Sequence, residues 1–208
     1  MPDREVNRKV VLGRTAVLDP AILDPAVLAE ELVEILARQG IMIAAAESCT
    51  GGLAADFIVR IPGASKVFWG SFVSYTADSK IKMLGVPEDL IKKHGEVSRP
   101  VALAMAEGAL KKSGASLAFS ITGFAGPGGA GENYPGASCP TGTVWIALAG
   151  RDEKAPNKLQ SEAKSFLFSG SRNEVREAAT AAALEELLLS VKSKVKSKVK
   201  LSVKSKLN

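Results

Sequence analysis

Residues 44–58 read AAAESCTGGLAADFI and join two kinds of secondary structure. Upstream, residues 41–46 are apolar at every position, which is typical of a central parallel strand covered on both faces. Downstream, an alanine-rich segment predicts a helix over residues 50–61, ended by Pro62-Gly63. The polar stretch ESCTGG (47–52) therefore lies where a strand meets a helix.

A junction of this kind can bind a ligand. In an open α/β sheet, ligands lie outside the carboxyl ends of the strands, where helix N-termini present unpaired N–H groups. The glycines of ESCTGG let the backbone approach a ligand closely, and its hydroxyls can bond or attack. Because Ser or Thr before a helix is also an ordinary N-cap, the stretch alone supports a site and a plain turn equally.

Helices and strands alternate along the rest of the chain. Asp24-Pro25 predicts the start of a helix that Gly40 ends. Two strands, at 143–150 and 163–169, follow each other without a helix, which predicts an antiparallel pair. We therefore expect an α/β layered sandwich, with further strands at 67–75 and 116–122 and further helices near 77–84, 87–94, 98–113 and 171–190.

The composition suits one globular domain with appendages. The chain has 208 residues, of which 46% are hydrophobic and 24% charged, and this length can bury a sizeable core. No apolar run approaches the roughly 18 to 20 residues that span a bilayer, and the charged N-terminus lacks the apolar core of a signal peptide. We therefore expect a cytoplasmic protein without a membrane partner.

Cysteine and histidine, the usual ligands of zinc, are few. The two cysteines, Cys49 and Cys139, are expected to be thiols because the chain shows no export signal. His94 is the only histidine, and no paired-ligand spacing occurs. We therefore expect no metal and no other cofactor.

The net charge of +5 is a property of the C-terminal tail. Residues 190–208 hold seven lysines and no acid, which leaves −2 for the rest of the chain. The globular part thus shows no general basic surface, and no nucleic-acid partner is expected. Valines spaced by four in the VKSK repeat would line a stripe if the last helix continued, but a solvated or fraying extension is the favoured interpretation.

Ser48 is a candidate nucleophile, and it then needs a base. His94 follows two lysines in a polar segment, where a lone histidine is most often only a surface residue. Lys80 or Lys82 could serve instead, provided that a neutral amine exists, and spacing does not choose among the three. Cys49 could be an activated thiolate, but a small core residue is favoured.

The segment 123–142 is too glycine-rich to be a core element. Long loops in compact domains tend to be functional or mobile. The glycine spacing matches neither a Walker motif nor a dinucleotide fingerprint, so the motif alone gives little support for phosphate binding.

Six motifs occur in the order of one known family: AESCTGG, SYTADSK, GEVSRPVALAMAEGAL, SITGFAGPGG, PTGTVWIAL and FSGSRNEVREAA. Over about residues 25–190 the chain resembles the C-terminal domain of CinA, the competence/damage-inducible protein family, whose stand-alone members are nicotinamide-nucleotide amidases. The resemblance implies a three-layer α/β/α sandwich with a mixed, mostly parallel five-stranded sheet. It also implies a cofactor-free Ser/Lys amidohydrolase of pyridine nucleotide salvage, which converts nicotinamide mononucleotide to nicotinate mononucleotide and ammonia.

Carried over motif by motif, the resemblance implies roles for single residues. Ser48 would attack the amide, Lys80 would be its base, and Tyr75 would orient the dyad or the substrate. Backbone N–H groups around 49–51 would stabilise the oxyanion. The residues implied to bind the substrate are Cys49, Thr50, Gly51, Thr122, Gly123 and Arg172, the last of them for the phosphate.

Two other functions stay open. A non-catalytic nucleotide- or partner-binding module could keep the same pocket. The lysine-rich tail could instead dock nucleic acid or an anionic membrane, although it has no aromatic residue to stack on bases. We expect an N-terminal extension at 1–24, the amidohydrolase domain at 25–190 and the tail at 191–208, with a small-molecule nucleotide as the partner and a homo-oligomer as the assembly.

Overall fold

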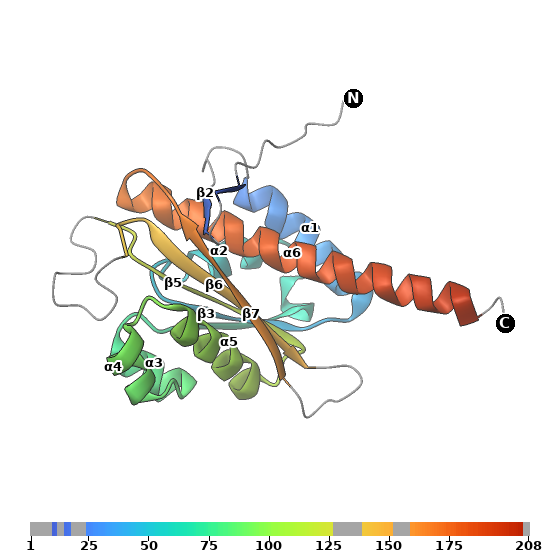
Figure 1. Ribbon diagram of the computed structural model, residues 1–208. Coiled ribbons are helices and arrows are strands. Elements are labelled where there is room, and N and C mark those ends of the chain that lie inside the picture. The colour runs from blue at the N-terminus through green and yellow to red at the C-terminus, as the bar shows by residue number, and fades with distance from the viewer. Residues whose placement is uncertain (1–9, 12–14, 18–23, 127–138, 152–158, 206–208) are drawn as a thin grey trace.

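The structure, a computed structural model, describes residues 10–11, 15–17, 24–126, 139–151 and 159–205. Figure 1 shows a central sheet with helices on both faces. One face is covered by α1 (Pro25–Gln39), α2 (Leu53–Val59) and α6 (Arg172–Ser205), and the other by α3 (Ala77–Leu84), α4 (Glu88–His94) and α5 (Arg99–Ser113). A 3-10 turn (Ala64–Lys66) precedes β4. The predicted three-layer α/β/α sandwich is thus confirmed.

The sheet has the strand order β1-β2-β7-β6-β5-β3-β4. Its five longer strands are β3 (Ile43–Glu47), β4 (Phe68–Val73), β5 (Leu117–Gly123), β6 (Thr143–Arg151) and β7 (Leu159–Leu167). β6 is antiparallel to both β5 and β7, as predicted for the last two strands, while β3 is parallel to β4 and β5. The sheet is therefore mixed. β3, β4, β5 and β7 run in the same direction, as "mostly parallel" implies, but both pairings of β6 are antiparallel.

Two short strands lie beyond the five. β1 (Val10–Val11) pairs with β2 (Thr15–Val17), and β2 adds to β7 in parallel. The sequence did not predict them. The remainder of the N-terminal extension and residues 127–138 of the glycine-rich loop lie outside the described residues.

The small side chains of β3 allow helices to pack on both faces of the sheet. Ile43 and Ala45 belong to the core under α1, α2 and α6, whereas Ala44 and Ala46 belong to the core under α3, α4 and α5. This alternation follows from the two-residue period of a strand. All five positions of β3 are buried, so the strand that leads into ESCTGG is fixed in the middle of the domain.

The approach of α5 to α3 depends on one glycine. A Cβ at Gly108 would lie 2.2 Å from the carbonyl oxygen of Leu84, the last residue of α3. Only a residue without a Cβ fits there, and the close contact holds α3 against the body of the domain. The position of α3 matters because it carries Lys80.

Most predicted helix ends agree with the structure. In α1 the Asp24 side chain accepts a hydrogen bond from the Ala26 N–H at 2.8 Å, and Gly40 ends the helix with a φ of 63°. α2 is shorter than predicted because residues 50–52 form a turn, and β7 begins four residues before the predicted strand at 163–169.

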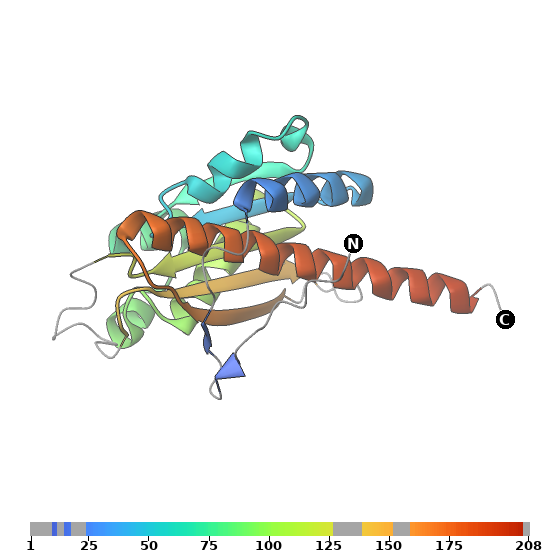
Figure 2. The same cartoon turned by 90° about the horizontal axis from the view of Figure 1, so that it is seen from above.

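The structure of the lysine-rich tail differs from the prediction that we favoured, a solvated or fraying extension. α6 continues to Ser205 and runs past the rest of the domain (Figure 2). Val191 is fully buried, Val195 packs against the core under α1, and Lys192 forms an ion pair with Glu31 at 2.6 Å. A solvated extension is therefore wrong for residues 191–195. Among the described residues no helix has both the length and the apolar character needed to cross a membrane.

Candidate active site

The ESCTGG stretch forms a tight turn between β3 and α2. The Ser48 N–H donates to the Ile121 carbonyl oxygen at 2.9 Å, and the Gly51 N–H donates to the Ser48 carbonyl oxygen at 3.1 Å. Gly51 and Gly52 have φ values of 62° and 96°, a region that residues with a Cβ rarely adopt. The two glycines therefore permit the turn that presents Ser48 at the carboxyl end of β3.

Glu47, a residue that the sequence analysis passed over, holds this turn together. Its side chain is fully buried. One carboxylate oxygen accepts from the Thr50 hydroxyl and from two amides, those of the α2 N-cap and of α2 itself. The other accepts from a second α2 amide and a hydroxyl of β4. The distances are Thr50 Oγ1 2.8 Å, Gly52 N 3.0 Å, Ala54 N 3.1 Å, Ala55 N 3.0 Å and Ser71 Oγ 2.9 Å. Glu47 thus accepts hydrogen bonds from the amides at the start of α2. A single acid between an apolar strand and a helix N-terminus could have indicated this role from the sequence.

Lys80 is the side chain that reaches Ser48. It lies in α3, which begins with a capping box between Thr76 and Ser79. The side chain is only 1% exposed, and its Nζ lies 3.0 Å from Ser48 Oγ. Lys82, in contrast, lies on the surface and pairs with Asp78 at 2.9 Å. The structure thus brings together the serine and the lysine that the family resemblance implied.

Lys80 Nζ has two further acceptors. The Glu96 carboxylate lies 2.9 Å away and the Tyr75 carbonyl oxygen 3.3 Å away. Glu96 was also not predicted as a site residue. No local sequence pattern marks it, because its contact with Lys80 joins the segment between α4 and α5 to α3. His94 lies at the end of α4 and is half-buried.

Thr122 and Gly123 end β5 beside this cluster. The buried Thr122 hydroxyl donates to the Glu96 carbonyl oxygen at 3.0 Å. A Cβ at Gly123 would lie 2.6 Å from a Val144 methyl group and 2.7 Å from the Thr143 carbonyl oxygen, so the glycine permits the packing of β5 on β6. Thr122 therefore holds the Glu96 backbone, and Gly123 lets β5 pack closely on β6.

Cys49 is a buried core residue. Its side chain is 5% exposed, and burial raises the pKa of the thiol from 9.0 to about 12. The thiol is therefore protonated at neutral pH. An activated thiolate is thus not what the structure supports, and the favoured interpretation as a small core residue holds.

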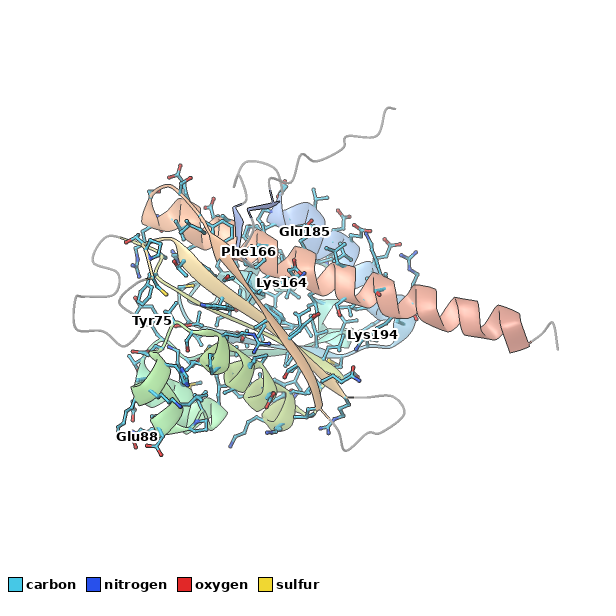
Figure 3. All side chains as sticks on the ribbon, in the orientation of Figure 1. Tyr75, Glu88, Lys164, Phe166, Glu185 and Lys194 are labelled. Atoms are coloured by element: carbon cyan, nitrogen blue, oxygen red, sulfur yellow. The ribbon has the colours of Figure 1, made fainter. Side chains whose placement is uncertain are left out.

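The N-terminus of α6 forms an exposed rim near the turn. Arg172, the first residue of the helix, donates to the Tyr75 hydroxyl at 2.8 Å. The Tyr75 side chain is 56% exposed and lies at the opposite end of the sheet from Lys194 (Figure 3). Tyr75 therefore contacts Lys80 through its carbonyl oxygen, and its hydroxyl faces the rim.

Arg176 connects this rim to the turn. Its guanidinium donates to the Thr50 carbonyl oxygen at 2.9 Å and to Asn173 Oδ1 at 3.1 Å. Arg176 was not among the predicted site residues, although a position four residues after Arg172 lies on the same helix face. The start of α6 is thus tied to the turn at residues 47–52 by a hydrogen bond.

A cleft elsewhere in the described residues lies apart from the cluster around Ser48. This cleft of about 320 Å³ is lined by Leu117, Leu148, Ala149, Gly150, Gln160, Ser161, Glu162, Ser190 and Lys194, and it shares no residue with the cluster around Ser48. No group of three or more His, Cys, Asp or Glu in the described part of the chain gathers as metal ligands would.

Comparisons with known proteins agree with the motifs. A family model described as the CinA C-terminal domain matches residues 26–191. The nicotinamide-nucleotide amidohydrolase PncC of Escherichia coli (strain K12) is 41% identical over 160 residues, covering 77% of this chain and 90% of that protein. A CinA-like protein of Akkermansia muciniphila is 42% identical over 178 residues, covering 86% of this chain.

The lengths of these relatives differ. The chain spans only 40% of the Akkermansia protein and 36% of a Symbiobacterium thermophilum relative that is 45% identical over 160 residues. Among solved structures, the competence/damage inducible protein CihA of Agrobacterium tumefaciens is 36% identical with a TM-score of 0.70, covering 84% of this chain and 98% of that one. On this sequence and structural similarity, the chain belongs to the family of the CinA C-terminal domain.

Proposed function

We propose that the chain is an amidohydrolase that converts nicotinamide mononucleotide to nicotinate mononucleotide and ammonia. The observation that carries the proposal is the contact of 3.0 Å between Ser48 Oγ and the buried Lys80 Nζ at the carboxyl end of β3. A hydroxyl beside a buried amine is a known arrangement of an activated nucleophile and its base. The name of the 41% identical E. coli relative supports the reaction and the substrate.

The chemistry divides into two halves. Ser48 Oγ attacks the carboxamide carbon while Lys80, as the neutral amine, takes the hydroxyl proton, and it gives that proton to the departing ammonia. The C–N bond breaks and an acyl-enzyme on Ser48 remains. Water then attacks the acyl carbon with Lys80 again as the base, which releases nicotinate mononucleotide and restores the serine.

The oxyanion of each step requires backbone donors. The Gly51 N–H donates to the Ser48 carbonyl oxygen and the Gly52 N–H to Glu47. The amides of Cys49 and Thr50 contact the Cys49 thiol, which is a weak acceptor, so we expect these two amides to be the donors to the oxyanion. Loss of one such donor typically costs about 3 to 4 kcal/mol of transition-state stabilisation.

Substrate positioning would come from the start of α6. Arg172 and the helix N-terminus can both face a phosphate, and the exposed Arg172 side chain donates a hydrogen bond to the Tyr75 hydroxyl. Binding energy from a phosphate remote from the amide helps to hold the carboxamide for attack. Tyr75 would line the space between the phosphate and the dyad.

The test is ammonia release. Purified protein is incubated with nicotinamide mononucleotide and with related pyridine nucleotides, and Ser48→Ala is the control. We expect release from the mononucleotide that the control lacks. Calorimetric binding without release above Ser48→Ala would instead identify a non-catalytic nucleotide-binding module.

A further inference from the structure

Lys80 Nζ lies among three oxygen acceptors: Ser48 Oγ at 3.0 Å, the Tyr75 carbonyl oxygen at 3.3 Å and Glu96 Oε2 at 2.9 Å. An ammonium has three N–H donors, so the cluster satisfies the charged form completely. A neutral amine has two N–H donors and one lone pair. Among the three partners only Ser48 carries a hydrogen of its own, so Glu96 and Tyr75 would take the two N–H groups and leave the lone pair facing Ser48.

Glu96 is itself held in place. Thr122 Oγ1 donates to its carbonyl oxygen at 3.0 Å, and Ser98 Oγ donates to the Gly95 carbonyl oxygen at 3.0 Å. The Gly95 N–H in turn donates to the Ile91 carbonyl oxygen at 2.8 Å. The Glu96 side chain is 28% exposed, whereas the Lys80 side chain is 1% exposed. A partly exposed carboxylate, whose backbone is held by Thr122, thus contacts a buried amine.

We propose that Glu96 is a positioning residue that completes a Ser48–Lys80–Glu96 triad, in which its carboxylate aims the Lys80 amine at Ser48 and stabilises the ammonium formed during attack. This proposal rests on the proposed function. Glu96 would have the role of the aspartate in a Ser-His-Asp triad, which orients the base and stabilises the cation that forms on it.

The proton inventory is simple. When Ser48 Oγ bonds to the acyl carbon, its proton passes to Lys80 Nζ, and the carbonyl electron pair moves onto the oxygen. The new ammonium then lies 2.9 Å from the Glu96 carboxylate. As the C–N bond breaks, Lys80 returns the proton to the leaving nitrogen. Glu96 exchanges no proton in either step.

The proposal predicts two linked effects of Glu96→Gln. Without the negative charge the ammonium is less stable during attack, so the rate at the alkaline plateau should fall about 10- to 100-fold, as for loss of a charged hydrogen bond. The carboxylate also favours the charged form of its partner, so half-maximal activity of Glu96→Gln should move to lower pH. A merely structural role would lower the rate without moving the profile.

Other ionisable groups near Lys80 do not produce this shift. Burial raises the pKa of the Cys49 thiol to about 12, so it stays neutral over the assay range. Glu47 faces the turn with five hydrogen-bond donors, and His94 and Arg172 are common to all variants compared.

Two readouts keep the inference separate from the substrate assignment. The first is the pH dependence of kcat and KM for ammonia release. The second is the rate at which phenylmethanesulfonyl fluoride labels Ser48, followed by intact mass; here the O–S bond forms, the S–F bond breaks, the proton passes to Lys80 and fluoride leaves. If ammonia release were absent but labelling still shifted with Glu96→Gln, the substrate would be wrong and the triad right.

Two variants serve as controls. Glu96→Asp keeps the charge with a shorter reach, so its profile should stay at the wild-type pH with a reduced rate. Glu88→Gln removes an exposed carboxylate that pairs with Lys92 at 2.8 Å, and its profile should match wild type. Thermal unfolding verifies that each variant folds. A Glu96→Gln profile that overlays wild type, a Glu96→Asp rate equal to wild type, or labelling of wild type no faster than of Ser48→Ala would overturn the triad.

Discussion

The turn at residues 47–52 and the N-terminus of α6 lie side by side, joined by the hydrogen bond from Arg176 to Thr50, yet they are built differently. Residues 47–50 of the turn are buried, and the five hydrogen bonds that Glu47 accepts determine its shape. The start of α6 is exposed, and Arg172 is held by a contact to an exposed tyrosine.

We infer from this difference that the turn would serve the reaction and the start of α6 would serve substrate recognition. Groups that must react within hydrogen-bond distance are placed by a fully paired interior, and no buried side-chain polar atom in the described residues lacks a partner. Arg172, which would hold the phosphate, lies at the surface, where a side chain can change without unpairing the core. Changes in the turn should therefore affect turnover and folding, and changes at the rim should affect substrate choice.

The largest effect is expected from the dyad. Ser48→Ala and Lys80→Ala should each lower kcat by at least about 10⁴-fold, and the double variant should be little worse, because residues that act as a unit are not additive. Steady-state ammonia release measures this, with Lys82→Ala as the matched surface lysine. Activity of Lys80→Ala within a few-fold of wild type would exclude Lys80 as the base and return attention to His94.

Glu47→Ala should be the most damaging change to folding. It leaves the amides of Gly52, Ala54 and Ala55 without their acceptor, so we expect a loss of at least about 3 kcal/mol in the free energy of unfolding. Urea denaturation measures the loss. Glu34→Ala, which removes an exposed partner of Arg38, should change stability by less than about 1 kcal/mol. Similar losses for both variants would mean that the turn does not depend on its carboxylate.

Arg172→Ala should act on substrate choice. We expect kcat/KM for the mononucleotide to fall about 10- to 100-fold, the range for a hydrogen bond to a charged group, while slow hydrolysis of the dephosphorylated nucleoside hardly changes. Arg38→Ala, another exposed arginine, is the control. Equal losses on both substrates would show that Arg172 supports the fold or the chemistry and not the phosphate.

The smallest effect concerns the cap of α6. Hydrogen bonds from the Ser171 side chain and backbone lower the pKa of Glu174. Because the native pKa is the lower one, the stabilisation is present above the unfolded pKa and is lost as the pH falls through the native value. Wild type should therefore have a slightly higher Tm than Glu174→Gln at neutral pH, and the gap should close in acid. A constant gap, or an equal one for Glu177→Gln, would contradict this.

Local patterns explain why much of the fold could be predicted. The Asp24 cap, the Gly40 stop and the apolar run into β3 depend on neighbours within a few residues, and each agrees with the structure. β2 could not be predicted in the same way, because its three residues pair with β7 about 150 positions away. The continuation of α6 depends likewise on tertiary packing, since Val191 is buried by distant residues.

The site shows the same limit. Spacing left Lys80 and Lys82 as alternatives because only the packing of α3 decides which lysine is buried, and the family resemblance chose between them. Glu96 and Arg176 act across 16 and 126 residues of sequence, so no local motif marks them. Glu47 was the exception, because a lone acid ahead of a helix start was visible in the quoted stretch. Substrate contacts, the domain boundaries and the homo-oligomer stay predictions.

The central claim, that Ser48 is the nucleophile and Lys80 its base, is tested most directly by trapping the covalent intermediate. Wild type is mixed with nicotinamide mononucleotide, quenched in acid within a turnover, digested and analysed by mass spectrometry. We predict a nicotinate-mononucleotide acyl group on Ser48 in wild type and none in Lys80→Ala. Turnover with no adduct on Ser48, or with the adduct on neighbouring Cys49, would contradict it.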